Sequence, residues 1–147
     1  MKRFTSLDGI WDFAIAKEIE DHDFYKKVAR WAERPEVAKA FEGFALDELR
    51  HRIRLEALKA GEVKFQETEI GNLGIADNVE PFKPQANMTY AAALLLAMQR
   101  EKQAFRFYTN LASMARNQQA KRVLMTLAQE EAQHKLKLEV EYDLTVF

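Results

Sequence analysis

The sequence predicts an all-α protein, an antiparallel four-helix bundle made of two helical hairpins that a long crossover joins. Apolar residues recur at intervals of three, four and seven in four long stretches, as they do on one face of an α-helix. The two halves of the chain also align without a gap at one constant offset, which pairs Glu18 with Glu101 and Glu48 with Glu131. A pseudo-twofold axis is therefore expected between the hairpins. At 147 residues, the chain is expected to form a single domain, residues 1–147.

The first hairpin is expected at about residues 7–60. Its first helix carries an apolar stripe over about residues 7–33, and Pro35 then suits the first turn of a second helix. Because the connection is short, the two helices are expected to pack antiparallel. The expected buried or half-buried positions of the second helix are Phe41, Phe44, Ala45, Glu48, His51, Ile53 and Leu55.

The crossover is expected at about residues 61–87, where the helical period breaks and three glycines and two prolines occur. The second hairpin is expected at about residues 88–143, followed by an apolar tail, residues 144–147, that either docks on the bundle or continues the helix. Asn87 or Thr89 can cap its first helix, and Asn117 marks the turn to its second helix.

Composition excludes several classes of function. The chain has no cysteine, which excludes disulfides, thiolate nucleophiles, iron–sulfur clusters and zinc–thiolate sites. Its formal net charge of −1 predicts neither a nucleic-acid partner nor an anionic membrane surface. The N-terminus lacks the apolar core of a signal peptide, and the longest apolar run, residues 90–98, is too short to cross a bilayer. We therefore expect a soluble, cytoplasmic protein.

Two copies of one motif carry the expected chemistry, a glutamate followed three residues later by a histidine. Both side chains of such a pair leave one face of a helix and can bind one metal ion. A single copy is common by chance, but here each copy also follows another glutamate by 30 residues. The six predicted metal ligands are Glu18, Glu48, His51, Glu101, Glu131 and His134. Carboxylates and imidazoles suit iron and manganese, and two divalent ions neutralise four carboxylates, so a site for two metal ions is predicted.

The chain resembles the rubrerythrin-like branch of the ferritin-like superfamily over about residues 10–140. Besides the two Glu-x-x-His motifs, the likeness rests on the pattern Ala-Ile-x-x-Glu-x5-Phe-Tyr at residues 14–25, which recurs at residues 97–108 with Met98 for isoleucine. The resemblance implies a ferritin-like bundle that holds two iron ions, for which manganese or zinc can substitute. It also implies that Glu48 and Glu131 bridge the ions.

By the same resemblance, Glu18 and Glu101 are terminal ligands, and one histidine binds each iron. Tyr25 and Tyr108 follow these glutamates by seven residues, and each either hydrogen-bonds a ligand carboxylate or lies in the core. Asp47 and Glu130 each precede a ligand histidine by four residues, and they either orient its imidazole or carry surface charge. His22 is not expected to bind metal.

The chain departs from classical rubrerythrins in two ways. They carry a cysteine-rich rubredoxin domain that this chain lacks, so a separate electron donor is expected, a rubredoxin-like protein or a flavoprotein. They also carry an additional glutamate at the position of Ala104. Asp21 occupies the equivalent position of the first half, three residues after Glu18. We hypothesise that Asp21 is an extra ligand or proton donor, and the alternative is a carboxylate at the rim of the site.

The resemblance implies a homodimeric oxidoreductase that reduces hydrogen peroxide or dioxygen and acts in oxidative stress. Two other functions stay open. The same ligand set serves the ferroxidase centres of ferritins, which feed iron storage. A bundle could also bind metal for stability alone, without catalysis.

Overall fold

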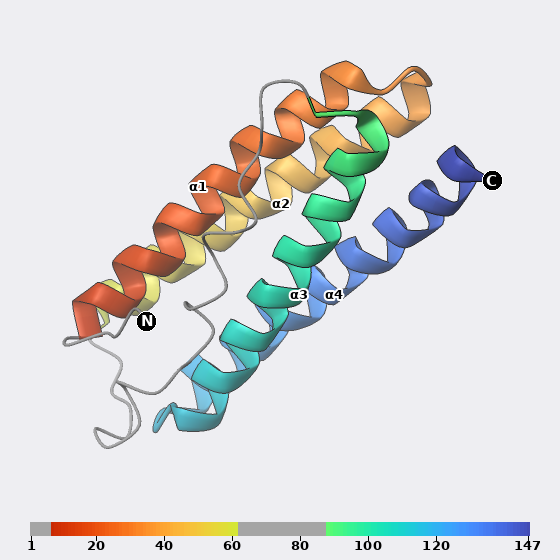
Figure 1. The fold of residues 1–147 in the computed structure, drawn as a ribbon. Coiled ribbons are helices and arrows are strands. Elements are labelled where there is room, and N and C mark those ends of the chain that lie inside the picture. The colour runs from red at the N-terminus through yellow and green to blue at the C-terminus, as the bar shows by residue number, and fades with distance from the viewer. Residues whose placement is uncertain (1–6, 62–87) are drawn as a thin grey trace. The chain divides into compact units, whose positions relative to one another are not determined.

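A computed structural model of the chain describes residues 7–61 and 88–147, and both segments are almost entirely helical (Figure 1). The four helices are α1 (Leu7–Trp31), α2 (Pro35–Ala60), α3 (Tyr90–Met114) and α4 (Gln118–Val146). No β-strand occurs in the two described segments. Helix α1 packs on α2 and α3 packs on α4, which gives two compact units, here named hairpin 1 (residues 7–61) and hairpin 2 (residues 88–147).

These four helices confirm the predicted all-α class and are consistent with a ferritin-like four-helix bundle. The predicted crossover lies outside the described residues, except for Gly61, which ends α2. The helix boundaries repeat the offset found in the sequence. Helix α3 begins and ends at the equivalents of the first and last residues of α1, and α4 begins at the equivalent of the first residue of α2. Only the end of α4 differs, because the apolar tail expected after Asp143 continues the helix to Val146.

Local sequence explains where the helices begin. Pro35 stands in the first turn of α2, where its missing N–H would have no intrahelical partner. The Thr89 hydroxyl caps α3 by accepting a backbone N–H of the first turn at 3.1 Å, whereas the other candidate, Asn87, lies outside the described residues. The Asn117 side chain caps α4 by accepting two backbone N–H groups, at 2.8 and 3.0 Å.

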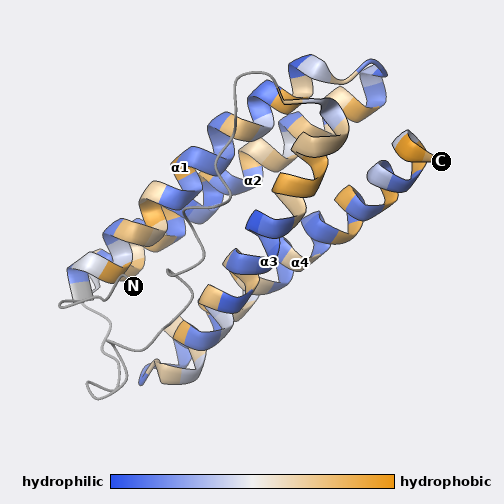
Figure 2. Ribbon diagram, viewed as in Figure 1, coloured by the Kyte–Doolittle hydropathy of each residue, from blue (hydrophilic) through white to orange (hydrophobic). Residues whose placement is uncertain are grey.

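Most of the buried positions are equivalent in the two hairpins, so the repeat extends to the core. The equivalent apolar pairs are Ile10 and Ala93, Trp11 and Leu94, Ala14 and Ala97, Val28 and Leu111, Phe41 and Leu124, Phe44 and Leu127, and Leu55 and Leu138. Figure 2 shows apolar and polar residues alternating along all four helices, as expected for helices that each bury one face. In the described part of the chain, no helix is long and apolar enough to span a membrane.

The prediction that Ile53 is buried or half-buried is wrong, because its side chain is 60% exposed. Ile53 follows His51 by two residues, which turns it about 200° around the helix, to the side facing away from the buried stripe. Leu55, four residues after His51, returns to the buried side and is fully buried.

Candidate metal centre

Glu18, Glu48 and His51 come together where α1 packs on α2 in hairpin 1. Glu18 projects from α1, whereas Glu48 and His51 project from α2, about one turn apart. Each of the three residues is at most 1% exposed. The Nδ1 atom of His51 lies 3.5 Å from Glu18 Oε2 and 3.5 Å from Glu48 Oε1. The two helices thus bring two carboxylates to the same side of one imidazole.

Hairpin 2 repeats this arrangement with Glu101 from α3 and with Glu131 and His134 from α4. The Nδ1 atom of His134 lies 3.5 Å from Glu101 Oε2 and 3.6 Å from Glu131 Oε1. The two glutamates are fully buried, and His134 is 3% exposed. The structure therefore brings the six residues together as two equivalent sets of three, one set inside each hairpin.

Each set has the donor chemistry of a metal site. In both sets, one potential ligand atom of each residue lies within 4.8 Å of the others. Ligand oxygens and nitrogens about 2.0–2.2 Å from a common ion are separated by roughly 3–4 Å, so small side-chain rotations suffice to bind one. Within a set, a protonated imidazole can balance only one of two carboxylate charges. Burying net negative charge is costly, and a divalent cation removes that cost.

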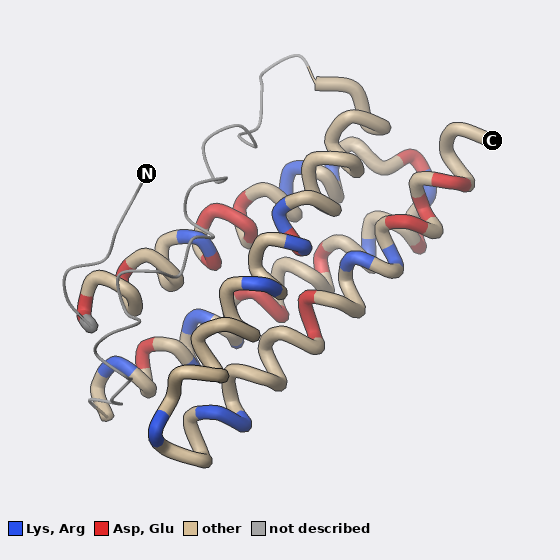
Figure 3. Tube along the Cα trace, turned by 60° about the horizontal axis from the view of Figure 1, so that its bottom comes forward, with Lys and Arg blue, Asp and Glu red and all other residues tan. Residues whose placement is uncertain are grey.

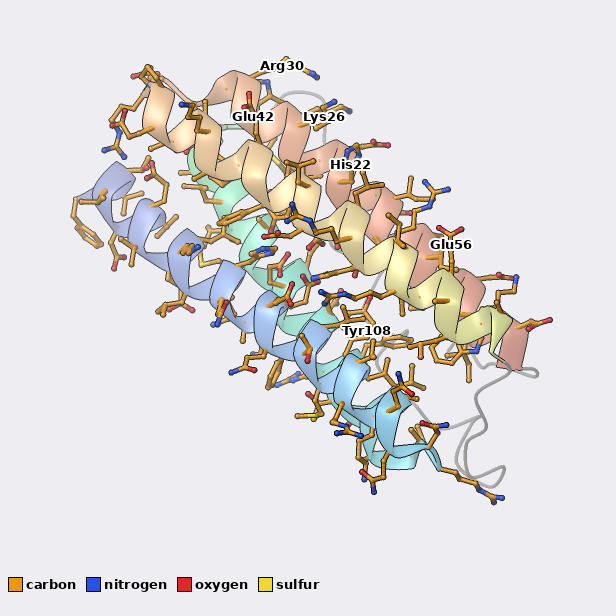
Figure 4. All side chains as sticks on the ribbon, turned by 180° about the vertical axis from the view of Figure 1, so that it is seen from behind. His22, Lys26, Arg30, Glu42, Glu56 and Tyr108 are labelled. Carbon is orange, nitrogen blue, oxygen red and sulfur yellow. The ribbon has the colours of Figure 1, made fainter. Side chains whose placement is uncertain are left out.

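The two tyrosines predicted near the site lie in the aromatic core. Tyr25 is 1% exposed, and its ring stacks on Phe41 with ring centroids 6.2 Å apart. Tyr108, labelled in Figure 4, is 2% exposed and meets Phe107 edge to face at 5.5 Å. Both tyrosines thus pack as core residues, and a hydrogen bond from either one to a ligand carboxylate stays a prediction.

Asp21 and His22 are neighbours in sequence but differ in environment. Asp21 is only 4% exposed, which places it in the interior of the molecule and not on its surface. The His22 side chain is 27% exposed, and its Nδ1 atom lies 3.0 Å from Asp23. Figure 4 shows His22 in one row with Lys26 and Arg30 along α1. This placement agrees with the expectation that His22 is not a metal ligand.

Asp47 pairs with a surface residue, because its carboxylate accepts a hydrogen bond from Arg50 at 3.0 Å. This contact fits the interpretation of Asp47 as a surface charge.

Sequence reasoning did not single out Arg100, which is only 5% exposed and directly precedes Glu101. The repeat pairs Arg100 with Lys17, which lies at the surface and pairs with Glu20 at 2.8 Å. Both residues are basic, so the sequence gives no sign that their environments differ.

Comparison with known families supports this account of the site. The sequence profile of the Rubrerythrin family matches residues 10–142, a range that covers most of both hairpins and contains all six buried glutamate and histidine residues. No curated protein and no solved structure compared with the chain matches it. The chain belongs to the rubrerythrin family.

Proposed function

We propose that the protein is a di-iron oxidoreductase that reduces hydrogen peroxide, or dioxygen, with electrons from a separate donor protein. One observation carries the proposal, the pair of equivalent, fully enclosed Glu-Glu-His sets. Membership of the rubrerythrin family supports iron as the metal, and a donor set of carboxylates and imidazoles without thiolates suits iron chemically.

In this proposal, the two sets of ligands join in one centre. Two iron ions would be held by Glu48 and Glu131 as shared ligands and by Glu18 and Glu101 as terminal ligands, and His51 and His134 would each bind one ion. Iron supplies reversible electron transfer when it is bound. The surrounding helices hold the ligands in place and keep bulk water away, since all six side chains are buried.

The proposed reaction takes two electrons from the donor and two protons from solvent. The O–O bond of hydrogen peroxide breaks, and two water molecules leave. We propose that Asp21 hands over a proton or serves as an extra ligand, which its burial three residues after Glu18 supports. The homodimer implied by the family stays a prediction, and light scattering that gives the mass of a single chain would contradict it.

Metal analysis and oxidant challenge test the proposal. The protein is purified without added metal, loaded anaerobically with ferrous iron, and mixed with hydrogen peroxide or with dioxygen. We expect about two irons per chain, oxidised much faster by peroxide than by dioxygen. Dioxygen-driven oxidation that continues well beyond two irons would indicate a ferroxidase for iron storage instead. Failure to bind iron would contradict the proposal.

A further inference from the structure

A shallow groove lies on the surface of hairpin 2, between α3 and α4. It has a volume of about 440 Å³. Its lining comes from both helices and consists of Lys102, Phe105, Arg106, Ala132, Lys135, Leu136 and Glu139. The groove thus combines basic side chains with exposed apolar ones, since Phe105 is 39% and Leu136 is 62% exposed.

The groove carries an excess of positive charge. Three of its residues are basic, and its one acidic residue, Glu139, already pairs with Lys135. Lys102 and Arg106 are exposed, and neither forms an ion pair within residues 7–61 and 88–147. Figure 3 shows the lysine and arginine positions along α3 and α4 in blue. The whole chain has a formal net charge of −1, so the excess of positive charge at the groove is a local feature and not the result of a basic chain.

The equivalent surface of hairpin 1 lacks this charge. The repeat places Ile19 at the equivalent of Lys102 and Asp23 at the equivalent of Arg106. Only Lys135 has a basic equivalent in hairpin 1, Arg52, and Arg52 pairs with Glu56 at 3.0 Å. The two hairpins therefore share most of their buried positions but differ in charge at this surface, which indicates a role that hairpin 2 alone performs.

The groove lies close to the proposed metal ligands of hairpin 2. Lys102 directly follows Glu101 on α3, and Lys135 directly follows His134 on α4. The groove and the buried ligands thus belong to the same helical turns and are separated by no more than about one helix diameter, roughly 10 Å. A redox centre seated in the groove would be close enough to exchange electrons with a metal on those ligands.

We propose that this groove is the docking site of the electron donor, a one-electron redox protein with an acidic face. The electron-transfer role rests on the proposed function. A protein fits better than a small anion, because the cations of small-ligand sites are normally enclosed, whereas Lys102 and Arg106 are exposed. Exposed charges steer an oppositely charged protein into place, and the apolar side chains at the rim give it contact area. Two such donors each deliver one electron for every peroxide reduced.

A charge-reversal experiment with a matched control tests the docking site. The variant Lys102→Glu/Arg106→Glu reverses the charge of the groove, whereas Arg116→Glu/Arg122→Glu makes the same change in charge elsewhere on hairpin 2. Binding of an acidic rubredoxin and of an acidic flavodoxin to the metal-free proteins is measured at low salt. Stopped-flow mixing of the reduced donors with the iron-loaded proteins then gives the rate constant of electron transfer.

We expect the groove variant to bind the donor at least tenfold more weakly and to be reduced at least tenfold more slowly. The control variant should stay within about twofold of the parent protein. The rate for the parent should fall steeply with ionic strength, whereas the rate for the groove variant should rise with it, because salt screens the repulsion between the reversed groove and the acidic donor.

Three outcomes would overturn the docking site. The first is that both double variants weaken binding and slow reduction equally. The second is that neither the rubredoxin nor the flavodoxin binds the parent protein. The third is competition by inorganic phosphate at constant ionic strength, which would indicate a small-anion site. A separate experiment tests the proposed function. If the iron-loaded parent protein does not reduce peroxide when a chemical reductant supplies the electrons, the proposed function is wrong. Binding to the metal-free proteins still decides the role of the groove in that case.

Discussion

The three histidines of the chain fall into two groups by their surroundings. His51 and His134 are at most 3% exposed, and each lies within 3.6 Å of two carboxylate oxygens. His22 is partly exposed and lies beside Asp23 at the surface. If the buried imidazoles bind metal, a histidine variant should affect the metal only when it changes one of these two residues.

We expect His51→Ala or His134→Ala to lower the iron content from about two to about one per chain. Loss of a direct ligand should weaken binding at that position by more than the 10–100-fold typical of outer-shell changes. His22→Ala is the matched control and should keep both irons. Metal analysis after dialysis against a weak chelator checks the prediction. Equal iron contents in all three variants would show that the histidines are not ligands.

Two aspartates two residues apart allow a similar test of proton delivery. Asp21 is 4% exposed, whereas the Asp23 side chain is 67% exposed. We expect Asp21→Asn to keep about two irons but to slow peroxide reduction by at least about 100-fold, in the range typical of general-acid groups. Asp23→Asn should behave like the parent. If Asp21→Asn has the turnover and iron content of the parent protein, Asp21 is a buried structural residue without a role in proton delivery.

At the residue scale, the sequence predicted which glutamates and histidines share a helix face, but it did not predict the burial of Arg100 or the exposure of Ile53. Helical spacing places Glu48 and His51 on one face. The second copy of the motif in the other half of the chain argues against a chance occurrence of this spacing. Arg100 escaped prediction, because burial of a cation depends on tertiary surroundings and not on periodicity. Ile53 was expected to be buried or half-buried from its apolar character, although its angular position puts it on the exposed side.

At the scale of the helices, the starts of α2, α3 and α4 were predictable because proline and capping residues mark them. Of the two possibilities for the apolar tail, docking on the bundle or continuing the helix, the structure has the second, since no glycine or proline follows Asp143 to stop the helix. The crossover between the hairpins was expected only from a break in periodicity, which gives no information about the conformation of those residues.

We expect Asn117→Ala to lower the free energy of unfolding by about 1 kcal/mol, because the first turn of α4 loses its cap. For a chain of this size, that corresponds to a fall in Tm of about 2–4 °C. Asn110→Ala, an exposed change inside α3, is the control and should not destabilise the protein. Thermal unfolding followed by circular dichroism measures both. An equal loss in the two variants would argue against a capping role.

At the scale of the whole molecule, the repeat is the property that links fold to function. Each hairpin buries one Glu-Glu-His set with nearly the same distances, so neither hairpin is specialised as the metal-binding half. Specialisation lies at the surface instead, where hairpin 2 has a basic groove and hairpin 1 does not. The central claim of the proposed function is that the six ligands bind two metal ions that are coupled to each other.

Mössbauer spectroscopy of protein loaded with ⁵⁷Fe and oxidised by peroxide tests that claim most directly. One shared centre predicts about two ferric ions per chain whose spins are antiferromagnetically coupled. The Mössbauer spectrum should then be a quadrupole doublet from a diamagnetic ground state, and the sample should give no ferric EPR signal. Glu48→Gln and Glu131→Gln should each weaken this coupling, because each removes a bridging carboxylate. Two magnetically isolated ferric ions, with the strong EPR signal of high-spin mononuclear iron, would contradict the account.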